Sequence, residues 1–448
     1  MSRAAREPDD WCLRGATLVT MDGARRVLRA DVRVNGGVIT RLGASRRPAR
    51  RTLELRGLVL LPGFVQAHVH LCQVLFRGMA DDLPLLPWLR ERIWPLEGAH
   101  TPASLRASAR LGVAELLLGG TTTVLDMGTV HHHDAVFEVL EESGLRALSG
   151  KSMVDQGEGV PDTLLETTGR SLASSHRLRE RWDGAAGGRL GYAYAPRFIL
   201  SCSAELLREV ATASETTGAL VHSHAAEHGA EREAVKAALG EDDVAALERH
   251  GLAGPRCVLA HGVQLRRSEM RRAARLGTRF VHCPSANLKL GSGIADVVAM
   301  RDAGMHVGLG ADGAPCNNRL DAFPELRQAA LLAKGKRRDA RALPAMEALE
   351  LLTCEGGRVL GLEDRIGSIE VGKRADLVAL DLRDLHHEPG GDVPSRIVYA
   401  AGPRDVRHVM VDGELLVESG ALRRMDRARV LRDARRHARA TARRAGLT

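Results

Sequence analysis

The sequence predicts an α/β protein: a (β/α)8 TIM-type barrel with a small β domain assembled from both chain termini. Eight short apolar runs alternate with helical stretches in the middle of the chain, whereas both ends carry hairpin-like patterns. Alternating strands and helices favour parallel pairing through right-handed crossovers, and closing eight such units into a barrel is the economical architecture. The 448 residues accommodate a barrel of roughly 250 residues together with an appendage.

The two ends of the chain predict the β domain. Asn35-Gly36-Gly37 separates two alternating runs, and Asp412-Gly413 separates two more near the C-terminus; both pairs of runs are typical of hairpins with tight turns. The expected divisions are an N-terminal part of the β domain at 1–62, the barrel at 63–365, the C-terminal part of the β domain at 366–420 and an arginine-rich helix at 421–448.

The eight expected barrel strands are short, apolar and bounded by turn residues. In chain order they lie within 58–70, 121–128, 145–155, 188–198, 218–227, 256–262, 278–287 and 305–313. The helix between the first two strands is predicted to begin at Thr101, a capping residue followed by Pro102, and to end at Gly119-Gly120.

Charge and composition exclude several classes of partner. The net charge of +8 comes entirely from 423–448, which has ten Arg, two Asp and no Lys or Glu, so the rest of the chain is balanced. A basic nucleic-acid face on the body is therefore not supported. We expect the tail to form a solvated, charged helix, with an anionic partner as the alternative. The four Trp, three Tyr and six Phe are too few for an aromatic groove.

The seven cysteines are scattered and form no CxxC motif, so neither a thiolate zinc site nor a redox pair is indicated. Their odd number and apolar surroundings suit reduced thiols. The N-terminus lacks the apolar core of a signal peptide, and no run of eighteen apolar residues occurs. We therefore expect a cytoplasmic protein without a membrane span.

Six polar residues lie at or near the ends of the expected strands. They are His68, His70, His224, Glu227, His261 and Asp312. The carboxyl ends of parallel barrel strands meet at one face, so these residues are expected to converge there. Neutral imidazoles together with a carboxylate suit a borderline divalent ion such as zinc.

The order of these motifs resembles the amidohydrolase superfamily. The motifs are PGF-x-x-x-HxH, HxxE, a histidine on the sixth strand and GxDG. The stretches HVHLCQVLFRGMADDLPLLPWLRERIWPLE, HCPSANLKLGSG and LGADGAPCNNRLD further resemble its S-adenosylhomocysteine, 5′-methylthioadenosine and 5′-deoxyadenosine deaminases and their chlorohydrolase relatives. The resemblance covers about residues 12–420.

The resemblance implies one zinc, or a similar divalent ion such as Fe2+, in each subunit. Its expected ligands are His68, His70, His224 and Asp312. His222 shares a strand face with His224, but the family's ligand is the histidine of HxxE, which leaves His222 as a packed or supporting residue. Binuclear relatives use a carboxylated lysine near the fourth strand. The fourth expected strand has no lysine and Lys151 ends the third, so we expect a mononuclear site.

Three residues receive catalytic roles from the same resemblance. Asp312 is expected to take a proton from the attacking water, Glu227 to protonate a ring nitrogen, and His261 to hold or polarise the attacking oxygen. The expected reaction is hydrolytic deamination of an adenine nucleoside with a modified 5′ position. The family suggests a homodimer or homotetramer, and no nucleic-acid or membrane partner is expected.

Two pairs of expected substrate-binding residues favour different substrates. Trp88 and Glu97 match the S-adenosylhomocysteine-type deaminases, in which the glutamate accepts hydrogen bonds from the ribose hydroxyls. Gln73 and Arg197 instead resemble guanine-type deaminases, since the nucleoside group usually has a histidine where Arg197 stands. The alternatives are therefore a guanine-like purine or pterin deaminase, a triazine-type chlorohydrolase, and a metal-free barrel used for assembly.

Overall fold

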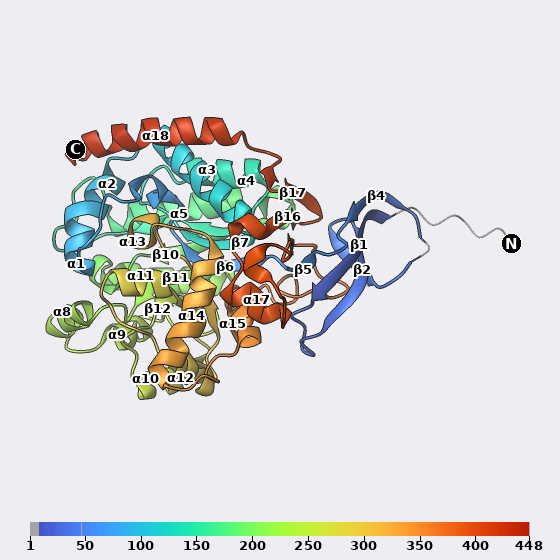
Figure 1. Ribbon diagram of the computed structural model, residues 1–448. Helices are drawn as coiled ribbons and strands as arrows, with labels where there is room; N and C mark the ends of the chain where they lie inside the picture. The colour runs from blue at the N-terminus through green and yellow to red at the C-terminus, as the bar shows by residue number, and fades with distance from the viewer. Residues whose placement is uncertain (1–8, 46, 448) are drawn as a thin grey trace.

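The computed structural model describes residues 9–45 and 47–447 (Figure 1). Within these residues, eight parallel strands form a closed barrel, because β11 pairs with both β10 and β12 while β14 pairs with β6. The predicted (β/α)8 barrel is thereby confirmed. Its strands are β6 (Phe64–Val69), β7 (Thr121–Met127), β8 (Arg146–Gly150), β10 (Leu190–Pro196), β11 (Leu220–Ala225), β12 (Cys257–His261), β13 (Arg279–His282) and β14 (Val307–Leu309).

The third predicted strand is interrupted at Lys151. Strand β8 ends at Gly150, and the two-residue strand β9 (Ser152–Met153) continues beside β10. A Cβ at Gly150 would lie only 1.8 Å from the Ala193 carbonyl oxygen, so the close approach of the two backbones requires glycine. Lys151 itself is buried and forms an ion pair with Glu166, in agreement with a structural lysine.

Helices surround the barrel and connect its strands. Helix α3 (Pro102–Leu118) begins as predicted, with the Thr101 hydroxyl accepting the Ser104 N–H, and it is followed by Gly119 and Gly120. The other helices of this part are η1 (Leu71–Phe76), α1 (Leu85–Trp88), η2 (Leu89–Ile93), α2 (Trp94–Gly98), α4 (Asp134–Ser143), α5 (Thr168–Trp182), α6 (Ala185–Gly188), η3 (Ile199–Ser201), α7 (Ala204–Thr217), α8 (Gly229–Leu239), α9 (Asp243–Arg249), α10 (Arg267–Leu276), α11 (Pro284–Lys289), α12 (Val297–Asp302), α13 (Ala314–Asn317), α14 (Ala322–Arg337), α15 (Ala345–Leu352) and α16 (Cys354–Val359).

The two chain ends share a second sheet, which in the described residues has the order β18-β17-β16-β15-β5-β1-β2-β3, with β4 beside β1. The central pair, β5 and β15, is antiparallel and joins the N-terminal to the C-terminal strands, as predicted. Figure 1 shows β1, β2 and β4 projecting away from the barrel. The strands are β1 (Asp9–Val19), β2 (Val27–Asn35), β3 (Val38–Leu42), β4 (Ala49–Glu54), β5 (Val59–Pro62), β15 (Leu377–Leu380), β16 (Val406–Val411), β17 (Glu414–Glu418) and β18 (Ala421–Leu422).

Both predicted hairpin turns are present. Gly36 and Gly37, between β2 and β3, have φ values of 57° and 75°. Asp412 and Gly413, between β16 and β17, have φ values of 55° and 77°. Two successive residues with positive φ form the two-residue turn whose twist matches that of the flanking strands.

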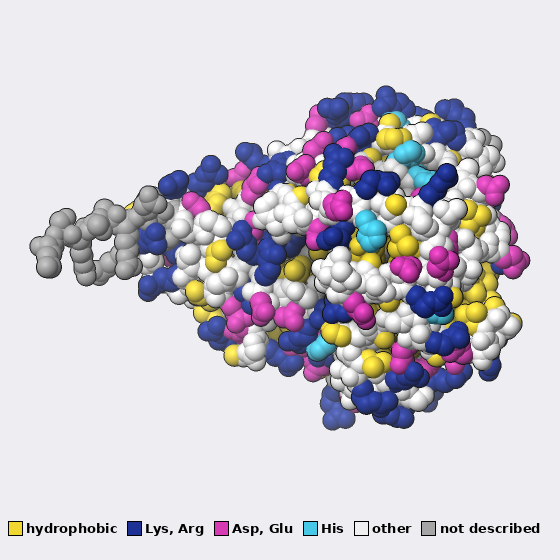
Figure 2. Space-filling view, turned by 180° about the vertical axis from the view of Figure 1, so that it is seen from behind, with side chains coloured by type: hydrophobic (Ala, Val, Ile, Leu, Met, Phe, Trp, Pro, Cys, Tyr) yellow, Lys and Arg dark blue, Asp and Glu magenta, His cyan; other side chains and the backbone are white. Residues whose placement is uncertain are grey.

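The C-terminal segment adds four helices to this sheet and barrel. They are η4 (Leu385–His387), α17 (Val393–Tyr399), η5 (Pro403–Asp405) and α18 (Arg427–Arg444). Helix α18 lies along α3 (Figure 1), and Ala434 and Ala442 pack in one cluster with Phe76 and Leu96. Figure 2 shows basic and acidic side chains interspersed over the opposite face of the molecule. Among the described residues, no helix has the length and apolar character that crossing a membrane requires.

Candidate active site and metal centre

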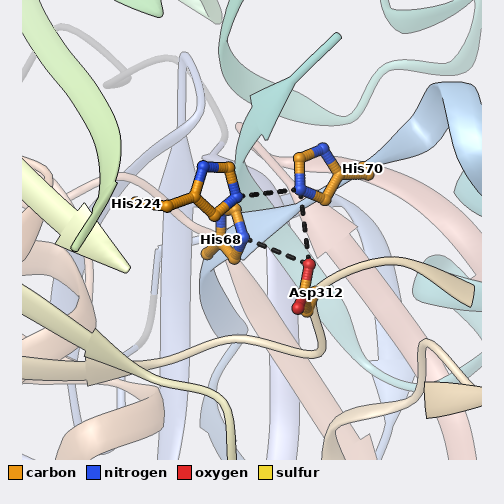
Figure 3. Close-up of side chains that lie close together, drawn as sticks. All are labelled: His68, His70, His224 and Asp312. Carbon is orange, nitrogen blue, oxygen red and sulfur yellow. Dashed lines mark hydrogen bonds and ion pairs between the residues drawn. The ribbon is translucent and has the colours of Figure 1, made fainter. Parts of the chain in front are cut away.

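The structure brings four of the predicted residues together at the carboxyl end of the barrel (Figure 3). One donor atom each from His68, His70, His224 and Asp312 lies within 4.8 Å of the others. Nε2 of His68 and Nε2 of His70 lie 3.2 and 3.3 Å from Asp312 Oδ1, and the Nε2 atoms of His70 and His224 are 3.3 Å apart. Ligands of a tetrahedral zinc, each about 2.0–2.1 Å from the ion, lie about 3.3 Å from one another.

Hydrogen bonds to backbone carbonyls determine which histidine nitrogens are available. His70 Nδ1 lies 2.8 Å from the Met127 carbonyl oxygen, and His224 Nδ1 lies 2.6 Å from that of Arg197. A carbonyl only accepts, so each Nδ1 carries the proton and each Nε2 carries a lone pair. Two lone pairs that face each other at 3.3 Å repel unless a cation lies between them. The donor set therefore fits a divalent metal ion.

His222 orients His68 from behind the cluster. Its Nδ1 donates to the Val258 carbonyl oxygen at 3.0 Å, which leaves Nε2 to accept from His68 Nδ1 at 2.7 Å. The Nε2 lone pair of His68 is consequently directed at Asp312, and this atom has no hydrogen-bond partner in the described part of the chain. Burial lowers the pKa of His68 to about 4 and that of His222 to about 3, so both rings are neutral at neutral pH.

Backbone geometry at strand ends positions Asp312 and His261. Their φ values are 63° and 80°, a left-handed conformation that non-glycine residues rarely adopt and that is often found at functional sites. Two residues before Asp312, a Cβ at Gly310 would lie 2.5 Å from the His68 carbonyl oxygen. This contact explains the first glycine of the GxDG motif, because only glycine lets the two strands approach so closely.

Glu227, His261 and Asp312 form a second group around the same space. His261 Nε2 lies 3.4 Å from Glu227 Oε2 and 4.0 Å from Asp312 Oδ2. His261 Nδ1 lies 2.9 Å from Asn287 Oδ1, so the amide oxygen accepts the Nδ1 proton and Nε2 is left as an acceptor. Sequence reasoning did not identify Asn287, although it is the last residue of the HCPSAN stretch.

The two carboxyl groups of this second group have opposite pKa shifts. Burial, together with the charges of Asp312 and Glu231, raises the pKa of Glu227 well above its usual range. Burial would also raise the pKa of Asp312, but the close contact with His68 and the nearby rings of His261 and His70 outweigh this effect and hold the pKa well below its usual range. An acid and a base thus face each other across the site.

The predicted substrate-binding residues lie on the opposite side of this space. Gln73 in η1, Trp88 in α1 and Arg197 after β10 line the same cavity as the catalytic group. Glu97 in α2 lies behind them and is only 2% exposed. Sequence reasoning did not identify four further lining residues, because single apolar residues and a carboxylate in the first turn of a helix carry no distinctive signal. They are Leu85, Leu89, Phe198 and Glu231.

Glu97 connects the two pairs of residues that favoured different substrates. Its Oε2 accepts from Arg197 NH1 at 2.6 Å, and its Oε1 accepts from Arg197 NH2 at 3.3 Å and from Gln73 Nε2 at 2.8 Å. Glu97, Arg197 and Gln73 therefore form one network rather than two alternative sites, and Trp88 lies outside its hydrogen bonds. Gln73 and Arg197 form the polar surface that a ligand would meet.

Comparison with known proteins gives the same family as the motifs. The Amidohydrolase family matches residues 59–416. A 5-methylthioadenosine/S-adenosylhomocysteine deaminase from Desulforudis audaxviator is 39% identical over 391 residues, which is 87% of this chain and 89% of that protein. A 5′-deoxyadenosine deaminase from Methanosarcina mazei is 35% identical over 434 residues, with coverage of 96% and 98%.

Solved structures share the whole fold. An adenosine deaminase from Xanthomonas campestris with bound zinc has a TM-score of 0.92 at 34% identity, over 98% of this chain and 99% of that one. The zinc complex of atrazine chlorohydrolase TrzN from Arthrobacter aurescens has a TM-score of 0.90 at 26% identity, with coverage of 96% and 100%. E. coli guanine deaminase has a TM-score of 0.80 at 28% identity, with coverage of 91% and 98%. The chain therefore belongs to the amidohydrolase family, and it is a hydrolytic enzyme of the deaminase type.

Proposed function

We propose that this enzyme is a zinc-dependent deaminase of an adenine nucleoside with a modified 5′ position, which it converts to the inosine analogue and ammonia. The expected substrates are 5′-deoxyadenosine, 5′-methylthioadenosine, S-adenosylhomocysteine and adenosine. The names of the relatives support the nucleoside. The chemistry is carried by one observation: Glu227 with a raised pKa and Asp312 with a lowered pKa flank His261 in one cavity.

The mechanism assigns each proton to a residue of this chain. A zinc ion held by His68, His70, His224 and Asp312 would supply a water whose pKa is lowered to about 7. Asp312 takes one proton from the attacking water as the water oxygen adds to the ring carbon that carries the amino group. Glu227, which is protonated, donates to the adjacent ring nitrogen, so the C=N electron pair moves onto that nitrogen. His261 Nε2 accepts a hydrogen bond from the attacking oxygen and orients it.

The second half of the reaction restores both carboxyl groups. Asp312 passes its proton to the amino group, the C–N bond breaks, and ammonia leaves. The remaining hydroxyl proton returns to Glu227 as the carbonyl forms. Both groups thus end in the protonation states in which they began, and the only change is the exchange of the amino group for the oxygen of water.

The residues on the polar side of the cavity give weaker support for a nucleoside as the substrate. Trp88 offers a ring surface, while Glu97 is held by Arg197 and Gln73. Direct contact between Glu97 and the ribose hydroxyls requires Arg197 to release at least one of its two bonds. If Arg197 does not move, Glu97 acts on the substrate through the donors that it orients.

A guanine-like purine or pterin is the second candidate. Gln73 Oε1 is buried without a hydrogen-bond partner among the residues that the structure describes, and Gln73 lines the same cavity as Arg197. One acceptor next to a set of donors is complementary to an amide edge of a ring. A triazine-type chlorohydrolase is a third candidate, supported by the similarity to TrzN alone.

A substrate panel distinguishes these candidates. Ammonia release is measured with adenosine, 5′-deoxyadenosine, S-adenosylhomocysteine, free adenine and guanine, and chloride release with a chlorotriazine. We expect the highest kcat/KM for a 5′-modified nucleoside and little turnover of free adenine. A preference for guanine over every nucleoside would select the second candidate, and chloride release as the main activity would select the third.

The assembly and location of the enzyme are further parts of the proposal. On the resemblance alone we expect a cytoplasmic homodimer or homotetramer with no nucleic-acid or membrane partner. Light scattering of the purified protein measures the oligomeric state, and a monomer at micromolar concentration would contradict this part.

A further inference from the structure

A second cluster of metal-binding side chains lies outside the barrel cavity, between β15 and β16. His386 and His387 are in η4, and Asp405 ends η5; one donor atom from each lies within 4.8 Å of the others. We propose that these three residues bind a second divalent transition-metal ion, which would tie η4 to η5. This site is independent of the deaminase chemistry.

The separations within the second cluster match those of the first. Nε2 of His386 lies 3.2 Å from Asp405 Oδ2, and Nε2 of His387 lies 3.3 Å from the same oxygen. Ligands of one tetrahedral ion lie about 3.3 Å apart, whereas an N–H donor bound directly to a carboxylate is usually at about 2.7–2.9 Å. Two imidazoles and one carboxylate favour Zn2+, Co2+ or Ni2+ over Mg2+ or Ca2+.

His387 supplies a second observation, which does not depend on these separations. It is 3% exposed, and among the described residues neither of its ring nitrogens makes a hydrogen bond. A buried polar atom without a partner is costly, and a bound ion gives His387 one. Asp405 Oδ2 is already engaged, because it accepts the Gly402 N–H at 2.8 Å. Asp384 Oδ2 lies 3.8 Å from His386 Nδ1, beyond hydrogen-bond distance, and adds negative charge near the cluster.

The short helices explain how two adjacent histidines reach one carboxylate. The rings of His386 and His387 are 4.0 Å apart between centroids and inclined by 44°, so their Nε2 atoms approach Asp405 from neighbouring directions. Asp405 directly precedes β16, and its carbonyl accepts the Asp381 N–H just after β15. An ion at this point would close the connection that carries α17 against α14 and α15 of the barrel.

Two opposing charges lie near the cluster, and one of them, Arg396, is held by the Leu382 carbonyl oxygen. The Arg404 Nε lies 3.9 Å from Asp405 Oδ1, but its side chain is 67% exposed and can turn into solvent. Its removal should therefore strengthen cation binding. A purely structural hydrogen-bonded cluster predicts no metal binding and hence no such effect.

Metal content tests the proposal. After equilibrium dialysis against Zn2+, elemental analysis should find two ions per parent chain. One ion should remain in His386→Ala/His387→Ala, one in His68→Ala/His70→Ala, and none in the combined variant. The matched control is His131→Ala/His132→Ala, an adjacent histidine pair in another loop, which should keep two ions. Deaminase activity should be unchanged in His386→Ala/His387→Ala.

An affinity measurement sharpens the test. In the His68→Ala/His70→Ala background, where one site is left, Arg404→Ala should lower the Zn2+ Kd by roughly 3–10-fold, as expected for removal of one partly screened charge. An ion count unaffected by His386→Ala/His387→Ala, or an Arg404→Ala variant that binds no more tightly, would each overturn the second site. Because the barrel site is counted separately, its failure would be visible as a different missing ion.

Discussion

The two sides of the barrel cavity are held in place by different kinds of bond. On the metal side, His70, His222 and His224 each bind a backbone carbonyl of a strand or strand end. On the substrate side, Arg197 and Glu97 come from separate elements and bind each other's side chains. Backbone carbonyl groups of the barrel thus orient the metal-binding histidines, whereas an ion pair between two side chains orients the substrate-binding residues. Substitutions on the two sides should have different consequences.

The largest effect should follow from replacing the metal-side histidines. His68→Ala or His70→Ala should abolish activity and remove the barrel-site metal while leaving a folded barrel, because residues at the carboxyl face of such barrels contribute little to the core. Elemental analysis and circular dichroism measure the two outcomes. Full occupancy of the barrel site in both variants would show that other residues hold the ion.

Glu227→Gln should lower turnover by roughly 10²–10⁴-fold with the metal retained, because glutamine cannot donate the required proton. The matched control is Glu233→Gln, which changes an exposed glutamate of the following helix and should have no effect. The measurement is kcat with adenosine and 5′-deoxyadenosine. If Glu227→Gln turned over at the parent rate, some other group would have to protonate the ring.

Glu97→Ala should change both the stability of the protein and its substrate preference. The substitution leaves the Arg197 charge buried and unpaired. Losing one partner of a buried pair costs about 3–5 kcal/mol of stability. Each charge-assisted bond lost to a ribose hydroxyl costs roughly 1.5–3 kcal/mol of binding. The double variant Glu97→Ala/Arg197→Met should recover part of the stability but not the nucleoside preference. Urea unfolding and kcat/KM for adenosine and adenine separate the two effects; full recovery of the preference would argue against any recognition role for Glu97.

A smaller and graded effect is expected from pH. Glu227 acts as an acid, so the active enzyme carries its proton; activity should be full below its raised pKa and should fall about tenfold per unit as pH rises through that value. Asp312 acts as a base, and its lowered pKa keeps it ionised in the same range. A profile of kcat/KM against pH measures this limb. Glu227→Gln should lack it, and an unchanged limb in that variant would assign it to another group.

Features of the fold that depend on neighbouring residues could be predicted from the sequence, whereas features that depend on contacts between distant segments could not. The turns at Gly36-Gly37 and Asp412-Gly413 were predictable, because their positive φ values require these residue types. The convergence of His68 and Asp312 followed from their places at strand ends. The break at Lys151 did not, since it depends on the contact of Gly150 with a neighbouring strand.

On the substrate side, the sequence predicted which residues line the site but not the contacts between them. Glu97 and Arg197 are 100 positions apart on different elements, and neither periodicity nor spacing indicates that they pair. The same limit applied to the contact of Asn287 with His261, because the motif gives the amide but not the direction in which it points. Such side-chain pairs depend on the final packing of several loops.

The pairing of β5 with β15 has implications for how the protein is made. Leu60 pairs with Ala379, so a ribosome must add about 320 residues before the first of these two strands meets its partner. At about 5–20 residues per second this takes roughly 16–64 s. Throughout that interval the nascent chain presents the unpaired apolar edge of β5, a surface that favours intermolecular association. Chains that terminate before residue 377 lack β15 altogether and should therefore aggregate more than the full chain.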